Sequence, residues 1–183
     1  INQTGAIALV ANAGAPAANV VYDTTSGTRA SNITTGALTF TTGANSVINY
    51  VARSAGSAIT TGAIGTTGTS AVSLPGSITI DNTFGCTTAP CTPVSGFVTN
   101  VNASTLATAS AGITIANVMN AFSDITIRGV SSSAAGVNYS AAINSSNRGI
   151  SISGISVGAG ATAYGIHGSS AAGVISALNT SNG

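Results

Sequence analysis

Short runs of alternating apolar and small polar residues recur between residues 124 and 178. Three of them stand close together: Ile125-Thr126-Ile127, Ile150-Ser151-Ile152 and Ile155-Ser156-Val157. Successive side chains of a β-strand point to opposite faces, so each run places its apolar residues on one side. The hexapeptide Ser132–Val137 also returns letter for letter as Ser169–Val174, 37 residues later. Recurrence on this scale predicts repeated units of one architecture.

The N-terminal half uses a similar unit. Ile33-Thr34-Thr35-Gly36-Ala37 reappears unchanged as Ile59-Thr60-Thr61-Gly62-Ala63, 26 residues later, and Phe40-Thr41-Thr42-Gly43-Ala44 shares its frame. An apolar residue, two threonines and a glycine are typical of a strand that ends at a corner. With coils of roughly 20 to 25 residues, the chain is expected to form about seven to nine of them. The 37-residue spacing does not fit this period.

These patterns predict an all-β fold, a right-handed parallel β-solenoid (β-helix), with residues 1–183 as a single β-rich domain. Inward side chains of one coil are expected to stack on those of the next, about 4.8 Å away. The expected inward residues are Ile78, Ile80, Ile125, Ile127, Ile150 and Ile152. A β-sandwich of the pilin kind is the alternative. One short helix near residues 115–122 is also predicted, because Ile115, Val118, Met119 and Phe122 recur at helical spacing.

Charged side chains are very few. The 183 residues include four Arg, three Asp, no Lys and no Glu, so 4% of the chain is charged, against about a quarter in ordinary soluble domains. The 44% apolar content favours a folded chain over a disordered one. Widely scattered Arg residues argue against nucleic acid as a partner. The apolar run over residues 5–21 is interrupted by Asn12, Pro16 and Asn19, which argues against direct membrane insertion. Because residue 1 is Ile, the chain is interpreted as a processed product or an excerpt of a longer one.

The two cysteines, Cys86 and Cys91, lie in a loop insertion rich in Thr and Pro at residues 84–97. Two thiols this close are expected to form a disulfide in an oxidising compartment, and the location is therefore predicted to be extracellular or the cell surface. Closing so small a ring contributes about 2 kcal/mol on the loop-entropy model. Free thiols in a reducing cytosol are the alternative.

No catalytic, cofactor or metal site is predicted. Gly154-Ile155-Ser156-Val157-Gly158 matches the nucleophile-elbow pattern, but glycines follow it where the elbow requires a helix. His167, the single histidine, is interpreted as a corner residue, and the three Asp are far apart in the sequence. We therefore expect the protein not to be an enzyme.

The segment Ala161-Thr162-Ala163-Tyr164-Gly165-Ile166-His167-Gly168-Ser169-Ser170, preceded by residues 150–155, resembles the passenger repeats of bacterial autotransporter-type surface proteins. In those repeats short Ile-rich strands alternate with Tyr-Gly-Ile and Ser-Ala-Gly corners. The resemblance implies secretion across the outer membrane, a parallel β-helix and a role in adhesion or surface structure.

Two functions remain open. The first is a non-enzymatic extracellular segment with a structural or adhesive role, whose partner is a host or surface ligand. The alternative is a self-assembling subunit of an extracellular filament or surface layer, a homopolymer joined by β-strand pairing between copies. The candidate assembly segment for that alternative consists of Thr4, Ala6, Ile7, Ala8, Leu9 and Val10.

Overall fold

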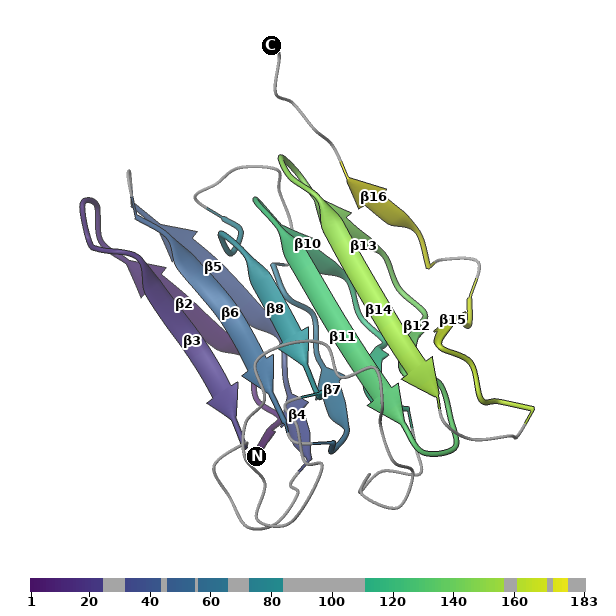
Figure 1. Cartoon of the computed structure of the whole chain (residues 1–183). Coiled ribbons are helices and arrows are strands. Elements are labelled where there is room, and N and C mark those ends of the chain that lie inside the picture. The colour runs from purple at the N-terminus through teal and green to yellow at the C-terminus, as the bar shows by residue number, and fades with distance from the viewer. Residues whose placement is uncertain are drawn as a thin grey trace.

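The computed structural model describes residues 1–24, 32–43, 46–54, 56–65, 73–83, 111–156, 161–170 and 173–177. These residues form sixteen β-strands and contain no helix, which confirms an all-β fold. The strands lie edge to edge in a long row, with β2 and β3 at one end and β14 to β16 at the other (Figure 1).

The strands belong to three faces, which we name sheets A, B and C. Sheet A contains β1 (Asn2–Gln3), β4 (Ile33–Thr35), β7 (Ile59–Thr61), β9 (Ile113–Ile115), β12 (Val137–Tyr139) and β15 (Ile166–Gly168). Sheet B contains β2 (Ile7–Ala11) with β5 (Leu38–Thr42), and β10 (Met119–Ala121) with β13 (Ile143–Ser145) and β16 (Ile175–Ala177). Ile64 joins the two parts of sheet B by single bridges to Leu38 and Met119. Sheet C contains β3 (Ala18–Asp23), β6 (Ile48–Arg53), β8 (Ile78–Asp81), β11 (Ile125–Ser131) and β14 (Ile150–Ser156).

Successive strands visit sheets A, B and C in turn, and we call one such passage a rung. Rungs 1, 2, 4 and 5 each supply one strand to every sheet, rung 3 supplies Ile64 in place of a sheet B strand, and rung 6 supplies β15 and β16. Every strand pairing among the described residues is parallel, as in a β-helix-like fold. A sandwich of the pilin kind relies on antiparallel pairs, so these pairings do not support that alternative.

The predicted helix near residues 115–122 is wrong. Ile115 ends β9 in sheet A, Met119 begins β10 in sheet B, and Ile125 begins β11 in sheet C. All three side chains are fully buried. The chain therefore turns a corner after Ile115, and the four-residue step from one inward position to the next imitates the spacing of a helix face.

The core is a stack of inward side chains that continues from rung to rung. Ile78, Ile80, Ile125 and Ile127 are all fully buried, and BP registers place Ile125 beside Ile78 and Ile127 beside Ile80. Of the other predicted inward residues, Ile150 and Ile152 are partly buried and pack against this core. Alternation along each strand keeps the intervening Thr and Ser residues on the outer face.

One of the two sequence repeats coincides with the structural repeat. Ile33 pairs with Ile59 across neighbouring strands of sheet A, so the two Ile-Thr-Thr-Gly-Ala copies lie one above the other. The hexapeptide copies do not. Ser132–Val137 leads from sheet C into β12 of sheet A, whereas Ser169–Val174 stands between β15 of sheet A and β16 of sheet B. The 37-residue spacing therefore relates two different corners.

Glycines allow the backbones of neighbouring corners to come into contact. A Cβ atom added at Gly62 would lie 2.4 Å from the carbonyl oxygen of Gly36, and one at Gly129 would lie 2.1 Å from that of Gly136. Both distances are far below van der Waals contact, and both neighbours are backbone atoms. The rungs can approach this closely only because these positions have no side chain.

Tyr50 is the largest fully buried side chain and stands inside the stack at rung 2. Its ring contacts that of Tyr22 in rung 1, with 5.8 Å between the ring centroids. Burial, reinforced weakly by Tyr22 and opposed by the nearby Thr35 hydroxyl, raises the pKa of Tyr50 far above 10.0. The folded protein therefore keeps this phenol neutral well into the alkaline range.

We expect Tyr50 to make the protein unstable in alkali. The unfolded chain releases the phenol proton near pH 10 and the folded chain does not, so this contribution is intact below pH 10 and declines above it. The free energy of unfolding should fall by about 1.4 kcal/mol per pH unit for this one group. Urea titrations between pH 8 and 12 should show this slope, and Tyr50→Phe should reduce it. Tyr164→Phe, at an exposed ring, is the control; an unchanged slope in Tyr50→Phe would contradict the assignment.

Candidate functional site

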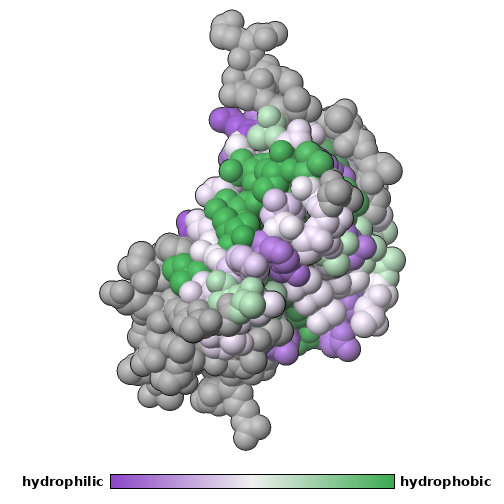
Figure 2. Space-filling model, turned by 90° about the vertical axis from the view of Figure 1, so that its right-hand side faces the viewer, coloured by the Kyte–Doolittle hydropathy of each residue, from purple (hydrophilic) through white to green (hydrophobic). Residues whose placement is uncertain are grey.

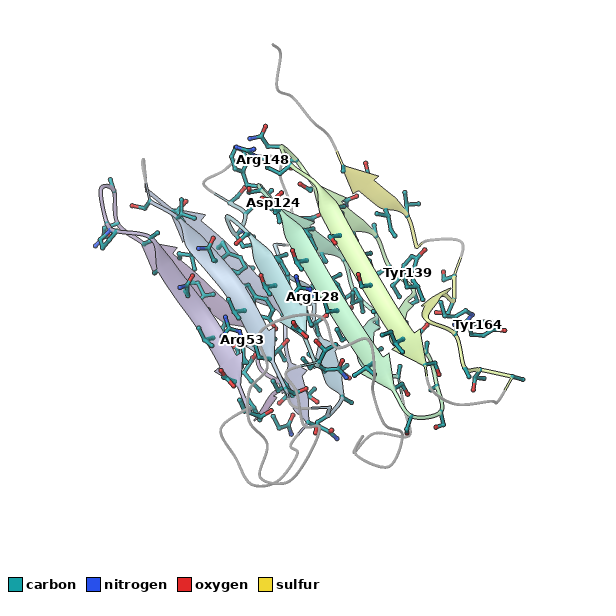
Figure 3. All side chains as sticks on the ribbon, in the orientation of Figure 1. Arg53, Asp124, Arg128, Tyr139, Arg148 and Tyr164 are labelled. Carbon is teal, nitrogen blue, oxygen red and sulfur yellow. The ribbon has the colours of Figure 1, made fainter. Side chains whose placement is uncertain are left out.

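Four of the seven charged residues form one row across the outer face of sheet C. Asp23 pairs in register with Arg53, Arg53 with Asp81, and Asp81 with Arg128. Their strands are adjacent, so each charge lies about 4.8 Å from a charge of opposite sign along the row. We call Asp23, Arg53, Asp81 and Arg128 the charge row. Figure 3 shows Arg53 and Arg128 on the broad outer surface formed by β6 and β11.

Asp81 is the most deeply buried member of the charge row. Its side chain is 3% exposed, and Oδ2 lies 3.5 Å from Nη1 of Arg128, whose side chain is 39% exposed. The other oxygen, Oδ1, accepts hydrogen bonds from the backbone N–H of Thr83 at 2.8 Å and from its hydroxyl at 2.5 Å. The carboxylate is thus satisfied on both oxygens, as a buried charge must be.

Asn82 follows Asp81 and ties rung 3 to rung 4. Its side chain is fully buried. Nδ2 donates to the carbonyl oxygens of Ser57 at 3.3 Å and Val130 at 2.9 Å, and Oδ1 accepts the N–H of Val130 at 2.7 Å. The amide therefore replaces backbone hydrogen bonds at the position where β8 ends and β11 continues.

The arrangement of the charge row is suited to holding strands in register. A slip of one strand position along the row would bring Asp beside Asp or Arg beside Arg, which is unfavourable. Sequence reasoning missed the row because its members are separated by 30, 28 and 47 residues. Only the register of the sheet brings them together, and the single available signal was that the charges alternate in sign along the chain.

We expect Asp81→Ala to lower the free energy of unfolding by about 2 to 3 kcal/mol. The change removes one charged partner of Arg128 and leaves the Thr83 donors buried without their acceptor. Asp124→Ala is the matched control, because exposed Asp124 accepts only one weak hydrogen bond, from Gly149 at 3.2 Å, and should cost less than about 1 kcal/mol. Equal losses in urea denaturation would show that the charge row has no special role.

The residues weighed for catalysis lie apart. His167 is on β15 in sheet A, where its ring stacks on Tyr164 with 4.8 Å between centroids. Ser156 of the elbow-like pattern is the last residue of β14, and residues 157 and 158 fall outside the described part of the chain. Asp124 stands at the start of β11, at the opposite end of that strand from Arg128's neighbours (Figure 3). Within the described ranges, no three His, Cys, Asp or Glu side chains gather as metal ligands.

Cys86 and Cys91, with the rest of the 84–97 insertion, lie outside the described residues, so their disulfide stays a prediction. The candidate assembly segment is placed: Thr4 and Ala6 flank the turn between β1 and β2, and Ile7 to Val10 belong to β2. β2 pairs with β5 on one side, and no other described strand lies on its other side. Ile7 is 36% exposed and Val10 69%.

None of the family models, curated proteins or solved structures compared with this chain matches it. The resemblance to autotransporter passenger repeats therefore stays a prediction. In the described ranges, which contain no helix, there is no candidate for a membrane-spanning helix.

Proposed function

We propose that the chain is a non-enzymatic structural or adhesive segment of an extracellular surface protein, folded as a right-handed parallel β-solenoid. The observation that carries this proposal is the in-register stacking of parallel strands through six successive rungs. Such stacking gives a scaffold that can be lengthened rung by rung, with each rung contacting only its neighbours.

The right-handed sense follows from a general rule of parallel sheets. Each return to the same sheet, as from β4 through β5 and β6 to β7, is a crossover between parallel strands. About 98% of such crossovers are right-handed.

The outer faces favour a scaffold over an enzyme. Their rows consist mainly of small polar side chains, such as Asn144, which donates to Asn120 at 2.8 Å, and Asn49, which donates to Asn19 at 3.1 Å. These side chains bond to their counterparts one rung away, so they support the stack. The charge row likewise satisfies Asp81 within the sheet.

Surface labelling tests the proposed location and role. Antibodies raised against the purified chain should stain intact, unpermeabilised cells of the source organism, and external protease should remove the signal. Beads coated with the chain should adhere to the surface for which the protein is specific more than beads coated with heat-denatured chain. Staining that requires permeabilisation would overturn the proposal, as would two free thiols at Cys86 and Cys91 in the mass spectrum of unreduced protein.

A further inference from the structure

The C-terminal end of the stack exposes side chains that occupy core positions. Ile166 continues the inward row of Val137 in sheet A, and Ile175 continues that of Ile143 in sheet B. Val137 and Ile143 are fully buried, whereas Ile166 is 45% exposed and Ile175 44%. Figure 2 looks at this end of the molecule and shows several apolar areas on it.

The N-terminal end has the same property. The pairing of Asn2 with Thr34 places Ile1 beside Ile33, and Ile7 pairs with Leu38. Ile33 and Leu38 are fully buried, whereas Ile1 is 46% exposed and Ile7 36%. Each end therefore presents one isoleucine in sheet A and one in sheet B, at core positions that lack a neighbour on one side among the described residues.

The two ends match each other in register. Pairings carry the position of Ile1 through Ile33, Ile59, Ile113 and Val137 to Ile166. Pairings and bridges likewise carry the position of Ile7 through Leu38, Ile64, Met119 and Ile143 to Ile175. A copy moved along the stack by one further rung would thus place Ile1 on Ile166 and Ile7 on Ile175.

We propose that a second copy of this chain stacks on the first, with its β1 parallel to β15 and its β2 parallel to β16. This inference rests on the proposed solenoid and adds the partner. The edges fit because, in a parallel stack, the outward N–H and C=O groups of the last strand face the same pattern that every inner strand faces. The four exposed isoleucines would be buried against each other, which supplies an apolar driving force.

The contact is confined to sheets A and B. Among the described residues, sheet C has no strand at the level of rung 6, so β14 and the second copy's β3 would stand two strand spacings apart, about 9.6 Å. Since the contact joins unlike ends and does not close on itself, repetition of it produces a filament.

Two single variants test the head-to-tail geometry. Ile7→Lys and Ile175→Lys each place an ammonium in the proposed contact, at positions that are 36% and 44% exposed in one copy. Sedimentation velocity of the wild-type chain should show assemblies that grow with concentration. Each variant alone should stay monomeric, with its dissociation constant raised at least about 100-fold. An equimolar mixture should form 1:1 dimers and nothing larger, because one unaltered pair of ends remains.

Cysteine pairing reads out the register. Asn2 and His167 occupy equivalent positions, since Asn2 pairs with Thr34 and the same row runs through Asn138 to His167. Asn2→Cys and His167→Cys chains, mixed and oxidised, should form a covalent dimer, because neighbouring strands lie within disulfide reach. Asn2→Cys mixed with Asn138→Cys, one rung inside the stack, is the control and should not.

Folding of each variant is checked by its far-ultraviolet circular dichroism and melting temperature, which should match those of the wild-type chain. A wild-type chain that stays monomeric at millimolar concentration would overturn the stacking while leaving the surface scaffold intact. So would protein from the source whose own further rungs cover both ends. Labelling confined to permeabilised cells would overturn the scaffold's location without affecting the sedimentation result.

Discussion

Replacing Ile127 by Asp is expected to abolish folding. Ile127 is fully buried, in register between Ile80 on one side and Ile152 on the other. A carboxylate there would lie among apolar side chains with no partner, at a cost of several kcal/mol beyond the lost burial of the isoleucine. That cost is comparable with the whole stability of an ordinary domain.

The neighbouring residue provides the control. Thr126 points to the outer face of the same strand, beside Thr79 and Ser151, so Thr126→Asp should cost only about 1 kcal/mol. Ile127→Val keeps the side chain apolar and should cost about 1 kcal/mol. Circular dichroism and size-exclusion chromatography distinguish these outcomes. An Ile127→Asp protein that elutes and melts like the wild type would contradict the inward assignment.

The second large effect is expected at Gly129. An added methyl group would lie 2.1 Å from the carbonyl oxygen of Gly136 and 2.6 Å from a methyl carbon of Val137. The first neighbour is backbone, so Gly129→Ala must displace a corner of rung 5, and we expect the free energy of unfolding to fall by about 3 kcal/mol.

Gly149→Ala tests whether that loss is specific. A methyl group there would meet only the Asp124 carboxylate, 4.0 Å away, so stability should change by less than about 0.5 kcal/mol. Urea denaturation of both variants gives the comparison. Similar losses at the two positions would indicate a general cost of replacing glycine in this chain, and would rule out close backbone approach as the cause.

Alternation along short segments was enough to predict the strands and their inward faces. Ile78, Ile80, Ile125 and Ile127 could be assigned to the core because period-2 patterns depend only on local geometry. The unit that begins at Ile33 returned at the true distance between rungs, so it also indicated the pairing.

Features that depend on corners and register could not be predicted in this way. The step from Ile115 to Met119 crosses a corner, and a corner that keeps both residues inward has nearly the spacing of a helical turn. The charge row joins residues as far apart as Asp81 and Arg128, with unequal spacings between rungs, so no fixed period would align them. The exposure of Ile166 depends on its position in the last rung, which is known only once the rungs are assigned.

The unequal spacing of the rungs also bears on the order in which the chain folds. Ile113 finds its partner Val137 after 24 residues, whereas Ile59 must wait 54 residues for Ile113. Closing the longer loop costs on the order of 0.6 kcal/mol more in chain entropy, and distant contacts form more slowly. We therefore expect two nuclei, one in rungs 1 to 3 and one in rungs 4 to 6, that dock late through β7–β9 and β8–β11. Pulse-labelled hydrogen exchange should find β9 to β14 protected before the amides between β7 and β9; simultaneous protection would indicate a single nucleus. The junction between rungs 3 and 4 would then be the place where the molecule comes apart first.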